Sequence, residues 1–126
     1  MKILLVEDNL MNQKVVMFNL KKLNCEITPV SNGRVALETF KNNKFDIVLM
    51  DIMLPEMNGY EITIEIRKFE ELNAVTNPVT IIALTANTYE NDKEKCLSIG
   101  MNDYLSKPFS AQQLIDAIEK FSGKNN

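Results

Sequence analysis

Hydrophobic residues follow two different patterns along the chain. In some segments they form short runs bounded by turn-forming residues, which is typical of strands in a buried parallel sheet. In the intervening segments they recur three and four positions apart, which is typical of helices that pack against a sheet. Strands are predicted over 2–6, 26–30, 45–51, 79–85 and 103–106. Pro29 lacks the backbone N–H that a central strand donates, so 26–30 is predicted as an edge strand.

A helix is predicted after each strand, over about 10–23, 33–43, 60–72, 88–98 and 111–122. The residues expected to face the sheet are Met11, Val15, Val16, Phe18, Leu20 and Leu23 in the first helix, Ala36, Leu37 and Phe40 in the second, Ile62, Ile66, Phe69 and Leu72 in the third, Tyr89, Cys96 and Leu97 in the fourth, and Leu114, Ile115, Ile118 and Phe121 in the fifth. The solvated face of the third helix is expected to carry Glu61, Glu65, Arg67, Lys68, Glu70 and Glu71.

Three signals mark boundaries of the last two helices. Ser110 and Gln113 have the spacing of a capping box, and Gly123 follows the fifth helix. Gly100 suits a left-handed stop for the fourth helix. The apolar stripe of the fourth helix is thin, so we expect it to pack lightly and to be the element that moves most easily.

Strands that alternate with helices indicate a parallel sheet, because right-handed crossovers place the helices on its two faces. Five such units are too few for a closed eight-stranded barrel, so an open, doubly wound sheet is predicted. The 126 residues fit one domain, 1–126, that buries a core without disulfides or structural metals.

Composition excludes several functions. The chain carries 14 Lys and Arg against 17 Asp and Glu, a net charge of −3, and no basic run, so direct nucleic-acid binding is not expected. No apolar run approaches the length of a membrane span, and we expect a soluble, cytoplasmic domain without direct membrane contact. The absence of histidine excludes a Ser/His/Asp triad and a histidine zinc site. Cys25 and Cys96 form no metal or redox motif and are expected as free buried thiols.

Polar side chains follow four of the five strands. They are Glu7 and Asp8, Asp51, Thr85, and Lys107. Each one alone would be an ordinary turn, strand or surface residue, but the carboxyl ends of parallel strands meet at one edge of the sheet. Three carboxylates gathered there repel one another and need a cation, and oxygen ligands with room for water and phosphate favour Mg²⁺ over Ca²⁺. A lysine and a hydroxyl beside them suit a phosphoryl group, and an Asp carboxylate can form an acyl phosphate.

At these positions the sequence resembles the receiver domains of two-component response regulators, over essentially its whole length. The matching residues are the acidic pair Glu7 and Asp8, Asp51, Thr85, Tyr104, and Lys107 with Pro108. Within that family, the segments 7–13, 82–87 and 100–108 are most similar to the receivers of hybrid histidine kinases. The resemblance implies a flavodoxin-like fold with strand order 2-1-3-4-5.

The resemblance also implies a role for each matching residue. Asp51 would accept a phosphoryl group from a phosphohistidine of a histidine kinase or histidine phosphotransfer domain. Asp8, Asp51 and the backbone carbonyl of Met53 would bind Mg²⁺, and Glu7 would act through a metal-bound water. Lys107 would contact the phosphate, and its bond to Pro108 would be cis.

A switch is implied as well. Thr85 would move toward the phosphoryl group while Tyr104 turns inward, and the lightly packed fourth helix would express the change. The surface formed by the fourth helix, the last strand and the last helix would be the output face, through which a homodimer could form.

One residue departs from the family pattern, and two others lie at positions that set the rate of acyl-phosphate hydrolysis in the family. Leu54 replaces the more usual methionine before Pro55, a change that conserves volume. Met53 and Asn87 lie where the family tunes hydrolysis of the acyl phosphate. Apolar Met53 cannot orient a water molecule, so a comparatively long-lived phosphorylated form is expected.

Other functions compete with this interpretation. Phosphatases of the haloacid dehalogenase type also use an Asp after a buried strand with Mg²⁺ and a lysine, but they have a second Asp where this chain has Met53. A pseudo-receiver that binds partners without phosphorylation is disfavoured by the complete set of polar residues. Flavin binding is disfavoured because no phosphate-binding loop follows Val6. The domain itself is therefore not expected to be an enzyme acting on other substrates, although it could belong to a hybrid kinase.

Overall fold

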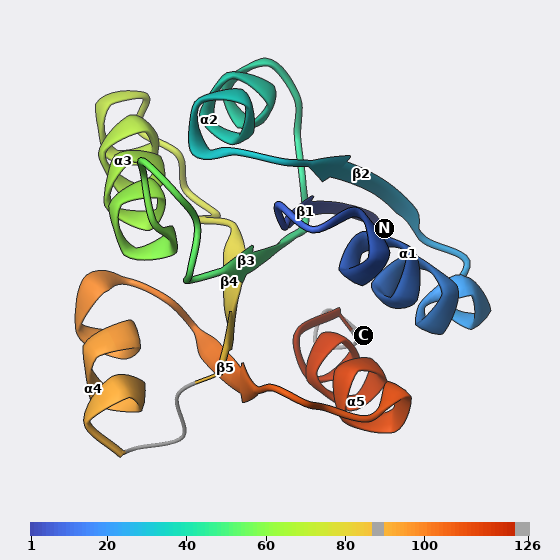
Figure 1. The fold of residues 1–126 in the computed structure, drawn as a ribbon. Helices are drawn as coiled ribbons and strands as arrows, with labels where there is room; N and C mark the ends of the chain where they lie inside the picture. The colour runs from blue at the N-terminus through green and yellow to red at the C-terminus, as the bar shows by residue number, and fades with distance from the viewer. Residues whose placement is uncertain (87–89, 123–126) are drawn as a thin grey trace.

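The computed structural model describes residues 1–86 and 90–122. Its centre is a five-stranded parallel sheet in the order β2-β1-β3-β4-β5, as predicted (Figure 1). The strands are β1 (Lys2–Val6), β2 (Glu26–Val30), β3 (Ile47–Asp51), β4 (Thr80–Thr85) and β5 (Asp103–Ser106). Pro29 lies on β2 at the edge of the sheet, where its missing N–H interrupts no inner pairing.

Helices cover both faces of the sheet. They are α1 (Leu10–Asn19), α2 (Gly33–Asn42), α3 (Gly59–Leu72), α4 (Glu90–Ile99) and α5 (Ala111–Ser122), with a short 3₁₀ helix, η1 (Lys21–Leu23), after α1. Helices α1 and α5 lie on one face, and α2, α3 and α4 on the other (Figure 1). Two separate hydrophobic clusters, one on each face, form the core. The alternating side chains of β1, β3 and β4 contribute to both clusters, which explains their continuous apolar runs.

Four helices begin with a polar cap directly after a loop from the carboxyl edge of the sheet. The side chains of Asn9, Asn32 and Asn58 each accept a hydrogen bond from the backbone N–H three residues later. Ser110 and Gln113 form the predicted capping box, with bonds of 2.8 and 3.1 Å. These caps fix where α1, α2, α3 and α5 begin relative to the strand ends.

The prediction for the first helix is partly wrong. Helix α1 ends at Asn19 and the chain continues into η1. Of the two predicted apolar stripes, Val16 and Leu20 are buried, whereas Met11 and Phe18 are 68% and 74% exposed and Val15 is half exposed. A straight helix presents one face to a flat sheet, and here Val16 and Leu20 occupy it. The second apolar stripe is left on the surface.

The prediction for the third helix is also partly wrong. Glu70, expected on the solvated face, is only 5% exposed, and Leu72, expected in the core, is 85% exposed. Leu72 is the last residue of α3, beyond the reach of the core, and Glu70 is buried because its charge is paired inside. On α4, Cys96 is buried as predicted but Leu97 is about half exposed. The positions predicted for Asn87, Thr88, Tyr89 and Gly123 lie outside the described residues.

Arg67 joins α3 to the end of α4 and the start of the last two strands. Its Nε and Nη2 atoms donate to the carbonyl of Gly100 at 2.9 and 2.7 Å, and its Nη1 atom lies 2.7 Å from Glu70 Oε1. The other Glu70 oxygen accepts from the Val79 N–H at 2.7 Å. Gly100 has φ +120°, so it stops α4 as predicted and leaves room for the arginine.

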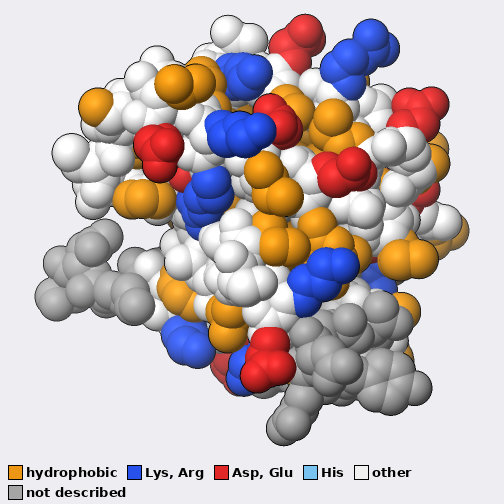
Figure 2. Space-filling view, turned by 90° about the vertical axis from the view of Figure 1, so that its left-hand side faces the viewer, with side chains coloured by type: hydrophobic (Ala, Val, Ile, Leu, Met, Phe, Trp, Pro, Cys, Tyr) orange, Lys and Arg blue, Asp and Glu red, His pale blue; other side chains and the backbone are white. Residues whose placement is uncertain are grey.

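The surface over α2, α3 and α4 is mixed. Across α2, α3 and α4, basic, acidic and hydrophobic side chains are interspersed (Figure 2), which is typical of a solvated face. Among the described residues, no helix is both long and apolar enough to cross a membrane. Cys96 is buried and Cys25 half-buried, both without a disulfide, and burial raises the pKa of the Cys25 thiol.

Replacing Arg67 with methionine should destabilise the fold. The change leaves the buried Glu70 carboxylate without its charged partner, and we expect the free energy of unfolding to fall by about 3 kcal/mol. Urea unfolding measures this difference. The matched control is Lys68→Met, because Lys68 and its partner Glu65 are exposed and the pair should contribute less than about 1 kcal/mol. Equal midpoints for the two variants would contradict the prediction.

Candidate functional site

The strand register brings the predicted polar residues to one edge of the sheet. Val6 on β1 pairs with Met50 on β3, so Glu7 follows at the level of Asp51. On the other side, Asp51 pairs with Leu84, directly before Thr85. Thr85 pairs with Ser106, directly before Lys107. Because all strands are parallel, every one of these side chains emerges at the carboxyl edge, as the sequence predicts.

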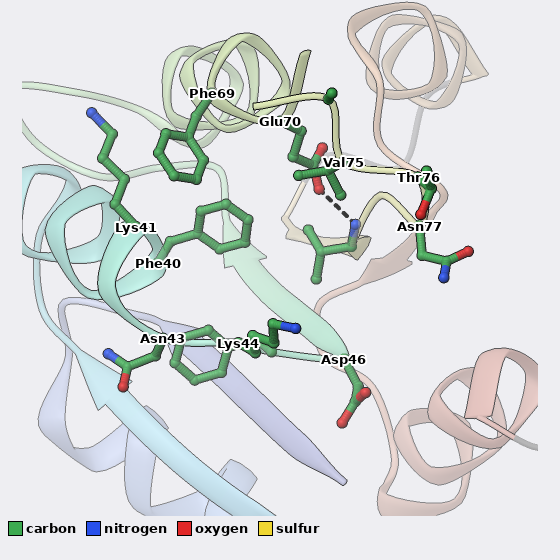
Figure 3. Close-up of a pocket in the computed structure, with 13 residues that line it drawn as sticks. Phe40, Lys41, Asn43, Lys44, Asp46, Phe69, Glu70, Val75, Thr76 and Asn77 are labelled. Carbon is green, nitrogen blue, oxygen red and sulfur yellow. Dashed lines mark hydrogen bonds between the residues drawn. The ribbon is translucent and has the colours of Figure 1, made fainter. Parts of the chain in front are cut away.

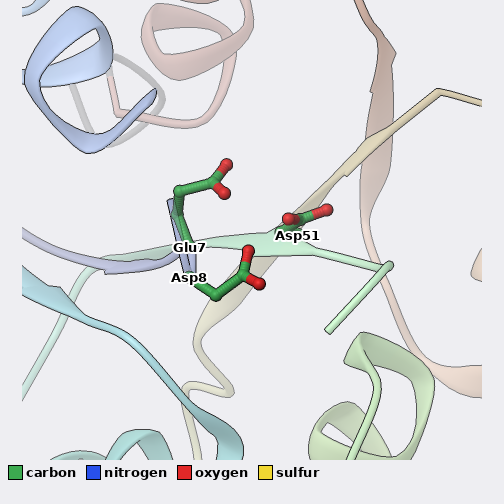
Figure 4. A group of neighbouring side chains, drawn as sticks. All are labelled: Glu7, Asp8 and Asp51. Carbon is green, nitrogen blue, oxygen red and sulfur yellow. The ribbon is translucent and has the colours of Figure 1, made fainter. Parts of the chain in front are cut away.

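Three carboxylates converge at this edge. One oxygen each from Glu7, Asp8 and Asp51 lies within 4.8 Å of the others (Figure 4). Glu7 and Asp51 are almost completely buried, whereas Asp8 is exposed. A Glu7 oxygen accepts the Asn9 N–H at 3.2 Å, which links the acidic pair to the cap of α1. The cluster therefore has a buried floor and an open side toward solvent.

Lys107 lies between two of these carboxylates. Its Nζ atom is 3.4 Å from Glu7 Oε1 and 3.4 Å from Asp51 Oδ1. The Lys107 N–H donates to the Thr85 carbonyl at 2.7 Å, which holds the lysine next to the end of β4. The Lys107–Pro108 peptide is cis, as the resemblance implied.

The donor set fits a divalent cation. Three carboxylates face one ammonium, so the cluster carries two more negative than positive charges. All three ligand groups are hard oxygens, and one of the three residues is open to solvent, which suits an ion that keeps part of its water shell.

Asp51 is held by the loop that follows it. The Met53 N–H donates to Asp51 Oδ1 at 3.2 Å, while the Met53 side chain is 69% exposed. The Gly59 N–H donates to the Ile52 carbonyl at 3.0 Å. A Cβ atom on Gly59 would lie 2.6 Å from the Asp51 carbonyl oxygen, so only glycine lets α3 begin this close to the strand.

Thr85 and Tyr104 share one face of the sheet. Tyr104 pairs with Ala83, which lies two residues before Thr85 and therefore on the same side of β4. Thr85 is buried and Tyr104 half-buried beside the cluster under α2, α3 and α4. Lys93 on α4 lies 5.8 Å from the centre of the Tyr104 ring. The two residues and α4 are thus neighbours.

Sequence analysis missed the part that Gln13 plays here. Gln13 is buried on α1, and its Nε2 atom donates to the Glu7 carbonyl at 2.7 Å. An amide on a helix usually faces solvent, so its residue type gave no indication. The position of Gln13 in the sequence does indicate burial. Gln13 precedes the buried Val16 and Leu20 by three and seven residues, which places it on the same helix face.

A hollow of about 560 Å³ lies at the opposite edge of the sheet and has no part in this cluster. Its lining includes Phe40 and Phe69, whose rings pack edge to face at 6.0 Å, and the Glu70 carboxylate that accepts the Val79 N–H (Figure 3). Asp46, which precedes β3, also borders it. The strands begin there, so the convergent carboxylates and lysine are absent from its lining.

Residues 3–119 match the family model described as "Response regulator receiver domain". Hybrid signal transduction histidine kinase B of Dictyostelium discoideum is 44% identical over 127 residues, covering 94% of this chain and 6% of the kinase. The chain spans between 5% and 25% of the length of such curated relatives.

Two solved structures agree with this match. A chain in the co-crystal structure of the Saccharomyces cerevisiae histidine phosphotransfer protein Ypd1 and the receiver domain of Ssk1 has a TM-score of 0.93 and 34% identity, covering 99% of this chain and 90% of that chain. The receiver domain of the Pseudomonas aeruginosa sensor histidine kinase PA1611, with magnesium in its active-site cleft, has a TM-score of 0.83 and 42% identity, with 98% of each chain covered.

Proposed function

The chain belongs to the family of response regulator receiver domains, and from this membership we propose that residues 1–126 form one receiver domain that is phosphorylated on Asp51. The observation that carries the proposal is the convergence of Glu7, Asp8 and Asp51 within 4.8 Å, with Lys107 at 3.4 Å from two of them. Stability alone would not favour three carboxylates in one place.

The phosphoryl donor must lie outside residues 1–126. The chain contains no histidine, so a phosphohistidine of a kinase or phosphotransfer protein would supply the group. An Asp51 oxygen attacks phosphorus, the new O–P bond forms as the N–P bond of the phosphohistidine breaks, and the leaving imidazole takes a proton from solvent. The domain modifies only itself, so it is a signalling module and not an enzyme with an external substrate.

Each neighbour of Asp51 has a role in this step. Glu7, Asp8, Asp51 and the Met53 carbonyl would hold Mg²⁺, Glu7 through a water molecule. When bound, Mg²⁺ supplies positive charge that offsets the negative charge of the phosphoryl oxygens. Lys107 contributes a second positive charge beside Asp51, and the Thr85 hydroxyl would donate to a phosphoryl oxygen.

Phosphorylation of Asp51 would change the conformation of the output face through Thr85 and Tyr104. Their shared face of the sheet, with Lys93 of α4 near the Tyr104 ring, supports a coupled movement of Thr85, Tyr104 and α4. The surface of α4, β5 and α5 would then be the output face and a possible homodimer contact. By its similarity to hybrid kinases, the domain would work in the cytoplasm as part of a phosphorelay.

The exposed apolar stripe of α1 would be the docking surface for the phosphoryl donor. It consists of Leu10, Met11, Val15 and Phe18, all at least half exposed. The stripe begins two residues after Asp8, so a protein bound there can reach Asp51. Exposed apolar side chains that are grouped on one helix indicate an interaction site more strongly than scattered exposed apolar residues do.

The donor on this surface would be a histidine phosphotransfer protein. Helix α1 has no acidic residue, and the exposed Lys14 and Lys21 lie near the stripe in sequence, which favours a partner surface that combines apolar and acidic side chains. The similar receiver chain that was crystallised with Ypd1 supports this class of partner.

Phosphorylation of Asp51 can be measured directly. Incubation with acetyl phosphate and Mg²⁺ should add one phosphoryl group to the intact mass, because the donor set then has its cation. A chelator, or the substitution Asp51→Asn, should abolish the gain. An Asp51→Asn protein that gains the group equally well would contradict the assignment, and wild type that binds Mg²⁺ but gains nothing would indicate a pseudo-receiver or a rapid phosphatase.

The exposed Met53 side chain should make the phosphorylated form long-lived, because a thioether does not orient an attacking water. Met53→Asn introduces an amide that can, and the decay of the phosphorylated protein, followed by mass, should become severalfold faster. Met53→Leu conserves volume and apolarity and should keep the wild-type rate. The same decay rate in Met53→Asn as in wild type would refute the prediction.

The substitution Phe18→Asp should slow phosphoryl transfer from a phosphorylated histidine phosphotransfer protein by about tenfold or more, because it places charge in the apolar contact. Labelling by acetyl phosphate should stay at the wild-type rate, since a small donor needs no docking surface. Ypd1 is the first donor to test. Leu72→Asp is the matched control, because Leu72 is also a highly exposed apolar residue but lies at the end of α3. Equal loss in both variants would exclude α1 as the docking surface.

A further inference from the structure

Gln13 is the buried polar side chain closest in sequence to the acidic pair. It is 6% exposed on the inner face of α1. Its Nε2 atom donates to the Glu7 carbonyl at 2.7 Å and lies 3.4 Å from both the Val30 carbonyl and the Ser31 hydroxyl. One amide group therefore joins α1, the end of β1 and the end of β2.

These bonds fix the backbone at the point where the chain leaves the sheet. Strand β1 ends at Val6, so the Glu7 carbonyl has no strand partner in the ladder. The Glu7 N–H donates to the Val30 carbonyl at 3.0 Å, and Gln13 supplies the donor for the Glu7 carbonyl. The backbone N–H and the backbone carbonyl of Glu7 therefore both have hydrogen-bond partners, and the peptide plane between Glu7 and Asp8 is fixed.

The position of that peptide decides where the main chain of the two ligand residues lies relative to Asp51. Without the Gln13 bond, the main chain at Glu7 and Asp8 would lose its side-chain link to α1, and a shift of this segment would carry both carboxylates away from Asp51. The Glu7 carboxylate is also restrained by the Asn9 N–H and by Lys107, but Asp8 is exposed, and the position of its main chain contributes directly to the position of its carboxylate.

We propose that Gln13 is a positioning residue for the divalent-cation site, holding the Glu7–Asp8 peptide so that both carboxylates face Asp51. This rests on the proposed function, since it assumes that the three carboxylates bind Mg²⁺. Gln13 does not touch the ion. It acts on the backbone of the ligand residues, as hydrogen-bond partners outside a metal's own ligands commonly do.

The test compares Mg²⁺ binding by wild type, Gln13→Met and Asn12→Met, each as the full chain. Methionine keeps the length of the glutamine side chain but cannot donate, and Asn12 is an exposed neighbour on the same helix. Isothermal titration calorimetry with MgCl₂ gives the dissociation constant. The increase of Tm with Mg²⁺ gives it independently, because only the folded site binds.

Gln13→Met should weaken Mg²⁺ binding about threefold to tenfold, the lower part of the range for residues that orient metal ligands. Asn12→Met should bind like wild type. In spectra of the Mg²⁺-free protein, Gln13→Met should shift the backbone amide resonances of Asp8 and Asn9, whose peptides border the fixed carbonyl. If Gln13→Met is too unstable to titrate, Gln13→Asn keeps the amide but shortens its reach, and should show the same loss in smaller degree.

Each outcome separates this proposal from the proposed function. A lower Tm for Gln13→Met with an unchanged Mg²⁺ dissociation constant would mean that Gln13 only stabilises the fold, and would overturn the proposal alone. Failure of wild type itself to bind Mg²⁺ would overturn the proposed function and this inference with it. A weaker affinity in Gln13→Met, with Asn12→Met unchanged, supports the positioning role.

Discussion

Electrostatic repulsion among three carboxylates is the constraint on which the rest of the site depends. At about 4 Å and an effective dielectric of ~20, each pair of like charges costs on the order of 4 kcal/mol. The parallel sheet nevertheless brings Glu7, Asp8 and Asp51 within 4.8 Å, and in the part of the chain that the structure describes only Lys107 pairs with them and partly offsets their charge. A cluster with excess negative charge favours the binding of a cation. The proposed binding of Mg²⁺ would offset that imbalance, and the proposed phosphoryl transfer, which brings further negative charge, would depend on it.

The scaffold around the carboxylates is held by polar contacts to the backbone. The Met53 N–H and the close approach of Gly59 fix Asp51, and Gln13 fixes the peptide of Glu7. Farther away, Arg67 fixes the end of α4 through the carbonyl of Gly100. These contacts hold the carboxyl edge of the sheet and the end of α4 in place.

The two faces of helix α1 have different surroundings. Val16 and Leu20 bury the inner face, and Gln13 on that face contacts the end of β1. Met11 and Phe18 lie on the outer face, exposed to solvent. Sequence periodicity cannot distinguish such a helix from one that is buried on a wide face, because both show apolar residues three and four positions apart. The apolar residues that the sheet leaves uncovered are the basis of the proposed docking surface.

The sequence by itself determined the alternation of strands and helices, the edge position of β2 and the polar residues at the ends of four of the five strands, because these depend on local periodicity, on residue type and on proline chemistry. Only the tertiary structure decided which apolar residues are covered, that Glu70 is buried with Arg67, and that Gln13 holds the Glu7 carbonyl. The physical reason is that burial and pairing depend on which surfaces meet in space. Contacts between residues distant in the chain, such as Arg67 and Gly100, determine burial and pairing. Local sequence patterns do not predict such contacts.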